Sequence, residues 1–387
     1  IGEEEWEHIK NTFDKDDVKE SLAKVAMEYP IPYASISEDD AFDALKKLKG
    51  MRHNEILVEG EWFAREGTDF KYDLTFEGKQ QYFKRINTGN KASNFFQQVN
   101  RWSVDGTIAP GPKRTWETEK YMTSLMGSAY SLKLSKIDAG NLRIMLSLRK
   151  YICSQFKPNV AKVLYDKLES KSILDFSAGW GDRLAGFYAS ETGEFYMGID
   201  PRKENHPIYH EQSEFYDKHR TMFEVPKKSM FVEHPAEDFE YKKNSYDTVF
   251  TSPPYFNVER YSYDDTQSWV RYKTIDEWNK NFLQHTLKKI WPSIKRGGYL
   301  LVNISDVYAS SGGSKKWLEI CNPMNNFLST FSDSEYKGCI GMEMAKRPNS
   351  GGAGTASEER FKDETKELAE QTKDKTFCEP IWVWKKY

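Results

Sequence analysis

The segment Thr251-Ser252-Pro253-Pro254-Tyr255 places a hydroxyl, two prolines and an aromatic ring directly after an apolar run, Tyr246 to Phe250. The run is typical of a β-strand, because β-branched and aromatic residues fill it and the prolines end it. Two prolines fix φ near about −65° and remove two backbone donors, leaving a stiff turn that presents oxygens. Such a turn can accept the hydrogens of an exocyclic amino group while Tyr255 stacks on its ring. A proline-terminated strand leading into a surface loop is the alternative.

An upstream stretch, Ser172 to Leu184, contains a short apolar strand, a Gly-x-Gly turn and the start of a helix. Small residues at such a turn let the backbone approach a ligand closely. A second strand, Glu194 to Asp200, ends in an acid about twenty residues later, where it can hydrogen-bond a ribose diol. The turn is not a full G-x-G-x-x-G, so the pattern favours a smaller nucleoside ligand over a dinucleotide.

In this order the features resemble the S-adenosylmethionine-dependent amino-methyltransferases that modify N4 of cytosine or N6 of adenine in DNA. The resemblance covers roughly residues 150–387 and implies S-adenosylmethionine as cofactor. It implies cofactor contacts from the turn and its surroundings, namely Phe156, Lys157, Pro158, Asp175, Phe176, Ser177, Ala178, Gly179, Gly181 and Asp200. Glu237 and Asp238 resemble the acid that reads the adenine amino group, and Glu379 to Lys385 resembles the closing strand of the family.

The same resemblance assigns catalysis to Ser252, Pro253, Pro254 and Tyr255, acting on a base flipped out of the duplex. The amino group would donate to the Ser252 hydroxyl and the Pro253 carbonyl, so that catalysis rests on positioning without a covalent intermediate or a metal. Serine at the first motif position favours cytosine N4 without excluding adenine N6. Methylation of RNA or of a protein glutamine, another base modification, and an inactive nucleic-acid-binding partner are the alternatives.

The four cysteines and seven histidines lack the spacing of metal ligands. Cys153, Cys321, Cys339 and Cys378 form no C-x-x-C pair and suit a reducing compartment. None of them follows a proline, which sets aside methylation of cytosine C5 through a Pro-Cys nucleophile. We therefore predict no metal site.

The composition of the 387 residues suits a packed core, with 38% hydrophobic and 14% aromatic residues. No run approaches the ~18 apolar residues of a membrane span, and the acidic start does not resemble a secretory signal. We expect a cytoplasmic protein, or a nucleoid or nuclear one, that is not secreted. The length allows two domains, which we place at residues 1–150 (accessory or target recognition) and 151–387 (catalytic).

Charge is distributed unevenly along the chain. Residues 1–83 hold 20 acidic and 11 basic residues, whereas residues 84–150 hold 12 basic and four acidic ones. Rings and amides interleave with the basic residues, and cations neutralise phosphates while rings stack on bases. This segment therefore predicts a surface for DNA, or for RNA, formed by Lys91, Arg101, Trp102, Lys113 and Arg114. A solvated helix and loop is the alternative.

Hydrophobic periodicity predicts helices from Trp6 to Val25 and from Asp40 to Leu48, then short strands such as Tyr72 to Phe76, as in a small α+β domain. In the catalytic part, an amphipathic helix from Ile275 to Ile294 precedes a buried strand from Gly297 to Ile304. This order predicts an α/β fold with a Rossmann-like, mostly parallel sheet, helices on both faces, and ligands at the carboxyl ends of the strands.

Two loops remain to be placed. Residues 256–263 follow the Ser-Pro-Pro-Tyr turn and are expected to line or cover the substrate. Residues 346–377 form a longer loop, either a lid that orders on DNA or a solvated insertion. Since no recognition domain follows the last strand, we expect specificity from the first 150 residues, from this long loop or from a separate specificity subunit.

Overall fold

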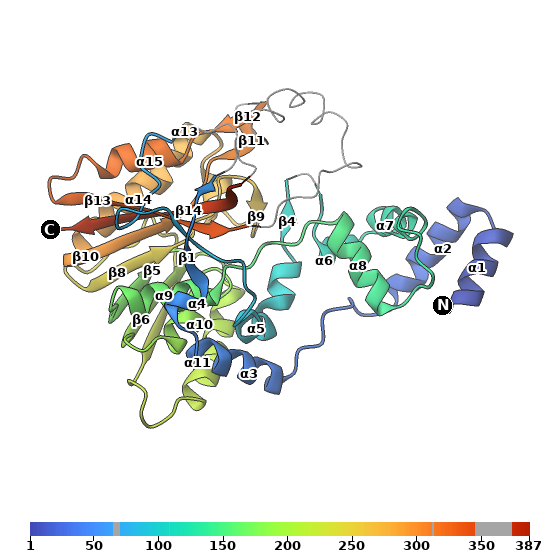
Figure 1. The fold of residues 1–387 in the computed structure, drawn as a ribbon. Helices are drawn as coiled ribbons and strands as arrows, with labels where there is room; N and C mark the ends of the chain where they lie inside the picture. The colour runs from blue at the N-terminus through green and yellow to red at the C-terminus, as the bar shows by residue number, and fades with distance from the viewer. Residues whose placement is uncertain (65–69, 108, 312, 345–373) are drawn as a thin grey trace.

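The computed structural model describes residues 1–64, 70–107, 109–311, 313–344 and 374–387, so most of the predicted 346–377 loop lies outside the described residues. Among them, ten strands form one sheet with helices on both faces (Figure 1). Five neighbouring strands run parallel, in the order β10 (Ile294–Asn303), β8 (Tyr246–Thr251), β5 (Ser172–Asp175), β6 (Phe195–Asp200) and β7 (Lys228–Glu233). The predicted α/β, Rossmann-like class is confirmed.

The other side of the sheet contains antiparallel pairs. β14 (Thr376–Lys386), which includes the predicted closing strand, pairs antiparallel with β10 and with β13 (Ser334–Glu343). The short strands β1 (Leu57–Glu59), β2 (Trp62–Phe63) and β3 (Gln81–Phe83) extend this side. The expected strand Tyr72 to Phe76 is wrong, because only Phe76 forms isolated bridges there. Part of the first 83 residues is therefore continuous with the sheet of the predicted catalytic domain.

Successive residues of the central strands point to opposite faces of the sheet and build two cores. Val249 packs with Trp278 and Leu287, whereas Phe250 packs with Val163 and Leu184. The helices on the Val249 side are α13 (Ile275–Glu277), the π-helix η1 (Trp278–Gln284), α14 (His285–Ile290), the 3₁₀ turn η2 (Trp291–Ser293) and α15 (Cys321–Leu328). The single helix predicted over 275–294 is thus divided into four segments.

The Phe250 side is covered by helices from both halves of the chain. They are α3 (Glu38–Lys49), α4 (His53–Ile56), α5 (Asn90–Trp102), α9 (Pro158–Lys167), α10 (Asp182–Ala189) and α11 (Asn205–Lys218). The predicted helix Asp40 to Leu48 is confirmed as α3. Because α5 packs against α10 and α11, the start of the basic 84–150 segment belongs to the sheet body.

A helical lobe stands to one side of the sheet (Figure 1). It consists of α1 (Glu3–Thr12), α2 (Lys15–Met27), α6 (Pro112–Trp116), α7 (Glu119–Ser131) and α8 (Ala139–Arg149). Trp6, Leu22 and Leu125 meet in its core. The helix predicted from Trp6 to Val25 is two helices, because Asp14 accepts hydrogen bonds from Asp16 N and Asp17 N and caps α2.

Small two-stranded sheets lie outside the main sheet. β4 (Asp105–Gly106) pairs with β9 (Glu259–Arg260), and β11 (Val307–Ser311) pairs with β12 (Ser314–Leu318); α12 (Ser268–Arg271) follows β9. None of the helices in the described ranges is long and apolar enough to cross a membrane.

Candidate functional site

The predicted turn, acid and Ser-Pro-Pro-Tyr motif meet at one edge of the sheet. β5, β6 and β8 are parallel neighbours, so the residues after their carboxyl ends lie together. Thr251 Oγ1, beside Ser252, donates to Asp175 Oδ1 over 3.0 Å. Across the turn, Gly179 N donates to Asp200 Oδ2 over 2.9 Å. These contacts connect the end of β8 to the end of β6 through the glycine turn.

The Asp175 carboxylate supports the turn from beneath. It is 0% exposed and forms an ion pair with Arg183 Nε at 2.7 Å. Tyr196 OH (2.7 Å), Thr251 Oγ1 and Ser177 N (3.2 Å) also donate to it. Four donors and complete burial leave this carboxylate no surface for a ligand, so its predicted direct cofactor contact is corrected to a positioning role.

The turn itself depends on its two glycines. Gly179 and Gly181 have φ of 59° and 70°, a region that favours glycine. A Cβ at Gly181 would also lie 2.4 Å from Gln212 Oε1. Gly179 O accepts hydrogen bonds from Asn205 Nδ2 (2.9 Å) and Tyr209 OH (2.6 Å). Phe176 and Ala178 are buried, so their side chains act in the packing of the turn.

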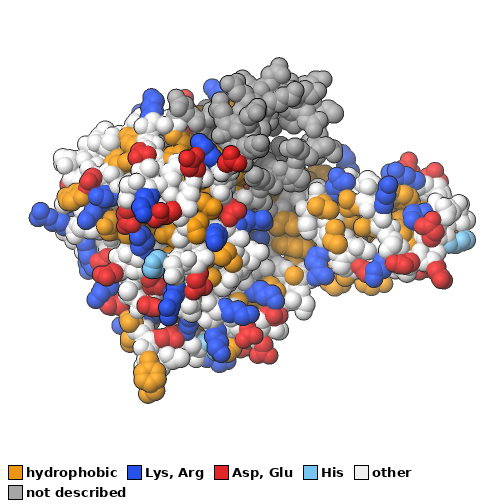
Figure 2. Space-filling model, in the orientation of Figure 1, with side chains coloured by type: hydrophobic (Ala, Val, Ile, Leu, Met, Phe, Trp, Pro, Cys, Tyr) orange, Lys and Arg blue, Asp and Glu red, His pale blue; other side chains and the backbone are white. Residues whose placement is uncertain are grey.

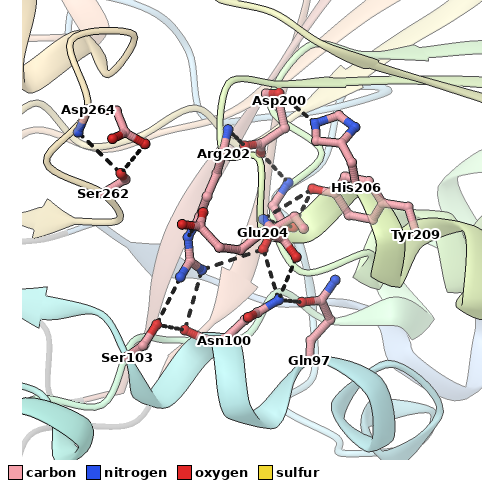
Figure 3. Close-up of polar contacts among 12 residues, drawn as sticks. Gln97, Asn100, Ser103, Asp200, Arg202, Glu204, His206, Tyr209, Ser262 and Asp264 are labelled. Atoms are coloured by element: carbon pink, nitrogen blue, oxygen red, sulfur yellow. Dashed lines mark hydrogen bonds and ion pairs between the residues drawn. The ribbon is translucent and has the colours of Figure 1, made fainter.

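Asp200 ends β6 with its carboxylate at the edge of this turn (Figure 3). Gly179 N donates to one oxygen, and Arg202 N donates to the other over 2.9 Å. A carboxylate has about four lone-pair positions, so these two bonds leave it capacity to accept from a diol. The side chain is 8% exposed, and this burial raises its pKa.

Arg202 connects this edge to α5, which sequence reasoning did not link to the site. Its guanidinium donates to Asn100 O (3.3 Å) and Ser103 Oγ (2.8 Å), and it lies over the ring of Trp180, 5.2 Å from the centroid. Figure 3 shows Arg202 reaching Asn100 and Ser103, with Ser262 and Asp264 at the upper left of the view. The contacts join residues about a hundred positions apart, so no local motif reveals them.

Ser252 is oriented by two residues from neighbouring strands. Its Oγ donates to Asn303 Oδ1 over 3.1 Å. Asn303, at the end of β10 and 1% exposed, donates through Nδ2 to Pro380 O over 3.1 Å. A carbonyl can only accept, so Pro380 determines which end of the Asn303 amide faces Ser252. The hydroxyl hydrogen of Ser252 is thereby engaged, and its oxygen keeps lone pairs that can accept.

Tyr255 is anchored by its hydroxyl group. Tyr255 OH donates to Glu379 Oε2 of β14 over 3.1 Å, and burial raises the pKa of the phenol. Asn303 and Glu379 were both missed as site residues. A polar residue at the end of the strand beside β8, and an acid in the closing strand, are the signals that would have found them.

The loop after Tyr255 is held on both sides. Asn257 Nδ2 donates to Ser310 O of the β11–β12 hairpin over 2.9 Å. On the other side, Thr107 Oγ1 donates to Val258 O over 3.0 Å. The predicted role of residues 256–263 in lining the substrate stays a prediction, and these contacts fix the loop next to the Ser-Pro-Pro-Tyr turn.

The other predicted cofactor residues lie further from these contacts. Arg271 Nη1 donates to Glu237 Oε1 over 3.0 Å and to Asp238 Oδ2 over 2.6 Å. Burial raises the pKa of Glu237. Phe156 packs under the Arg183 guanidinium, 4.9 Å from the ring centroid, and so belongs to the cluster around the turn. Lys157 Nζ instead donates to Asn87 Oδ1 (2.9 Å), and Pro158 begins α9.

The five predicted nucleic-acid residues do not form one surface. Trp102 is 6% exposed and packs with Tyr33 in the lobe core, so its stacking role is corrected to a structural one. Arg101 NH2 donates to Cys153 O (3.0 Å), and Lys91 pairs with Asp40 (2.7 Å). Lys113 and Arg114 are about half exposed, on α6. On the face drawn in Figure 2, basic and acidic side chains are interspersed over the body.

The side chains at this edge differ from those of a metal site. Among the residues that the structure describes, no group of three or more His, Cys, Asp or Glu side chains could hold a metal ion. The groups at the edge that can contact a ligand include the serine oxygen, the Asp200 carboxylate, backbone groups and aromatic rings. This set suits hydrogen bonding to a nucleoside and to an amino group.

Comparison with solved structures finds methyltransferase folds. A SAM-dependent methyltransferase from Methanosarcina mazei is 12% identical over 56% of this chain and 93% of its own, with a TM-score of 0.34. A tRNA methyltransferase from Aquifex aeolicus is 11% identical over 60% and 70%, with a TM-score of 0.34. An rRNA methylase from Streptococcus thermophilus is 7% identical over 60% and 99%, with a TM-score of 0.35.

No protein-family model and no curated protein matches the chain. At these low TM-scores the neighbours carry no argument about substrate, and the functional conclusion rests on the carboxyl edge of the sheet.

Proposed function

We propose that this protein is an S-adenosylmethionine-dependent methyltransferase that modifies an exocyclic amino group of a base in DNA, with cytosine N4 favoured over adenine N6. One observation carries the proposal. The Ser252 hydroxyl donates to Asn303, so the serine oxygen can still accept a hydrogen bond. The neighbouring Thr251 donates to Asp175, which supports the glycine turn, and Gly179 of that turn donates to the buried Asp200. A hydrogen-bond acceptor beside a turn that suits a nucleoside cofactor could hold a substrate amino group close to the methyl group of that cofactor.

The residues at the edge of the turn fit the proposed cofactor. S-adenosylmethionine supplies an electrophilic methyl group on a sulfonium. Asp200 keeps lone pairs for the two ribose hydroxyls, and the turn from Ser177 to Gly181 permits close approach of the backbone. Phe156 and Arg183 pack beneath that turn. Glu237 and Asp238 stay candidates for the adenine amino group.

Catalysis in this proposal is positional. Ser252 Oγ and the Pro253 carbonyl accept the two amino hydrogens, which withdraws the nitrogen lone pair from conjugation and directs it at the methyl group. Tyr255, held by Glu379, stacks on the flipped base. In the transfer, a bond from nitrogen to the methyl carbon would form as the carbon–sulfur bond breaks with its electron pair going to sulfur, and the proton that the nitrogen loses would pass to solvent water.

The test is transfer of a radiolabelled methyl group to duplex DNA, single-stranded DNA, RNA and a glutamine-containing protein in parallel, followed by digestion to nucleosides or amino acids. We expect label in N4-methylcytosine. Label in N6-methyladenine would keep the reaction class and correct the base. Label only in RNA or protein, or none at all with demonstrable cofactor binding, would overturn the DNA proposal.

Ser252→Ala provides the first site-directed test. We expect turnover to fall by about 10- to 100-fold, because one acceptor for the amino group is lost, with cofactor affinity nearly unchanged. Ser172→Ala is the matched control, since Ser172 begins β5 at the opposite edge, where its hydroxyl donates to Ser245 O over 2.9 Å. Equal turnover in both variants would remove Ser252 from the mechanism.

A further inference from the structure

A connected series of contacts between cations and aromatic rings runs from the helical lobe to the segment after the Ser-Pro-Pro-Tyr turn. We call this series the basic-aromatic row. Its members are Tyr121, Arg114, Tyr263, Trp269, Arg260 and Lys273. Arg114 lies in α6, Tyr121 in α7, Arg260 in β9 and Trp269 in α12, while Tyr263 and Lys273 lie in the segments on either side of α12. Figure 1 shows α7, α6 and β9 in that order from the lobe toward the sheet.

The lobe end of the row is a ring between two cations. Arg114 lies 5.7 Å and Lys150 lies 5.9 Å from the centroid of Tyr121. Arg114 NH1 also reaches Tyr263 OH at 3.5 Å. Buried Asp105 fixes this junction, because it accepts from Tyr263 OH (2.9 Å) and pairs with Arg114 (3.2 Å).

At the sheet end of the row, two cations lie near the ring of one tryptophan, Trp269. Arg260 and Lys273 lie 5.2 Å and 5.4 Å from the centroid of Trp269. Tyr263 meets Trp269 edge to face, at 5.5 Å and 84°. Tyr263 is 56% exposed, which makes it the most open ring of the row. Arg260 ends β9, only a few residues beyond Tyr255.

We propose that the basic-aromatic row binds one polynucleotide strand and leads it to the Ser-Pro-Pro-Tyr turn. Cations beside rings suit such a strand, because the cations neutralise phosphates while the rings stack on unpaired bases regardless of sequence. A folded acidic protein would match the charges but would offer no succession of flat faces for the rings. This inference rests on the proposed function and names the surface that holds the substrate next to the reacting base.

The test is fluorescence anisotropy with the full chain and labelled single-stranded DNA, a hairpin duplex of the same sequence, and polyglutamate. We expect the single strand to bind most tightly. Tyr263→Leu should weaken it about 5- to 100-fold, the range for loss of one base-stacking ring, while Tyr263→Phe retains most of the affinity. Lys273→Gln should lower the salt dependence by about 0.7 in the slope of log K against log salt.

Matched controls come from exposed residues outside the row. Tyr29→Leu (65% exposed, after α2) and Lys171→Gln (66% exposed, before β5) should leave strand binding unchanged. The row is overturned if the control variants lose as much affinity as the row variants, if Tyr263→Phe binds as poorly as Tyr263→Leu, or if the duplex or polyglutamate binds as well as the single strand. Thermal unfolding of each variant excludes loss of fold.

Methyl transfer by the same proteins separates this inference from the proposed function. Strand binding that depends on Tyr263, without any methyl transfer by the unaltered protein, supports the row and contradicts the proposed reaction. Methyl transfer by the unaltered protein, together with strand binding that Tyr263→Leu does not change, supports the reaction and overturns the row.

Discussion

At the scale of single residues, the chemistry of the candidate site depends on which hydrogen bonds each polar group already makes within the protein. Pro380 O engages Asn303 Nδ2, Asn303 Oδ1 engages the hydroxyl hydrogen of Ser252, and the serine oxygen is left to accept. The Asp175 carboxylate, in contrast, already accepts from four donors within the protein. The sequence predicted a ligand contact for both Asp175 and Ser252, and only their partners distinguish the supporting carboxylate from the serine oxygen that can still accept.

Asn303→Ala should lower kcat about tenfold or more with little change in cofactor affinity, because Ser252 can then turn its hydrogen toward the amino group. Stability should also fall by about 1–3 kcal/mol, since Pro380 O loses its buried donor. Asn325→Ala is the matched control: Asn325 is equally buried but accepts from Trp384 Nε1 (3.0 Å), away from Ser252. A comparable fall in kcat in both variants would make Asn303 merely structural.

Asp200 should make cofactor affinity depend on pH. Burial raises its pKa, and only the carboxylate can accept from both ribose hydroxyls, so affinity should increase as pH rises through that pKa. Asp200→Asn should bind about 10- to 100-fold more weakly and with no such pH dependence. Titration calorimetry with S-adenosylmethionine between pH 4.5 and 8 measures both effects, and a pH-independent affinity in the unaltered protein would contradict the assignment.

At the scale of elements, α5 is the helix that contacts the residues around the glycine turn and Asp200. Besides the contacts to Arg202, Gln97 Nε2 donates to Gln212 Oε1 over 3.3 Å, and Ser93 donates to buried Asp182 at the start of α10. Gln155 Nε2 also donates to Asp182, over 2.8 Å. Asp182 Oδ2 has no hydrogen-bond partner in the described part of the chain. Burial of this acid raises its pKa to about 6.

Asp182 should therefore contribute less to the stability of the protein as pH rises from about 4 to 6. In that range the native state keeps a proton on Asp182 that the unfolded chain has released, so raising the pH favours unfolding. A shift of about 2 pKa units corresponds to roughly 3 kcal/mol. Asp182→Asn should remove this contribution, and urea unfolding at pH 4.5 and 7 should show a smaller pH difference in that variant. Identical pH differences would contradict the prediction.

Sequence patterns predicted the elements of this edge but not their supports. β5, β6 and β8 were identifiable because apolar runs end at glycine, acid or proline, which are local signals. The position of α5 depends on contacts with residues about a hundred positions away, and Asn303 matters only because β10 pairs with β8 and β14. The basic segment was misread at Trp102, since charge patterning does not reveal which face of α5 a second core buries.

At the scale of the whole molecule, the chain enters the helical lobe twice, before α3 and after β4. The lobe has its own core, around Trp6, Leu22 and Leu125, separate from the two cores of the sheet. The substrate surface proposed above runs from this lobe to the sheet. The predicted accessory region is thus shared between the lobe and the sheet body, and its basic residues are divided between them.

Leu125→Ala should loosen the lobe selectively. Removing this buried side chain should cost about 2–5 kcal/mol, and hydrogen exchange should accelerate in α1, α2 and α7 while amides of β5 and β8 keep their protection. Leu301→Ala, in β10, is the matched control and should accelerate exchange in the sheet. Uniform acceleration by either variant would mean that lobe and sheet unfold as one unit.

The contacts of β14 have a consequence for the order in which activity appears during synthesis. Tyr255 is held by a glutamate 124 positions further along the chain, and Asn303 by a carbonyl 77 positions beyond itself. When Ser252 and Tyr255 leave the ribosome during synthesis, the strand that orients them has therefore not yet been made. Under the proposed function, we therefore expect methyl transfer only after β14 has been synthesised and has paired with β10.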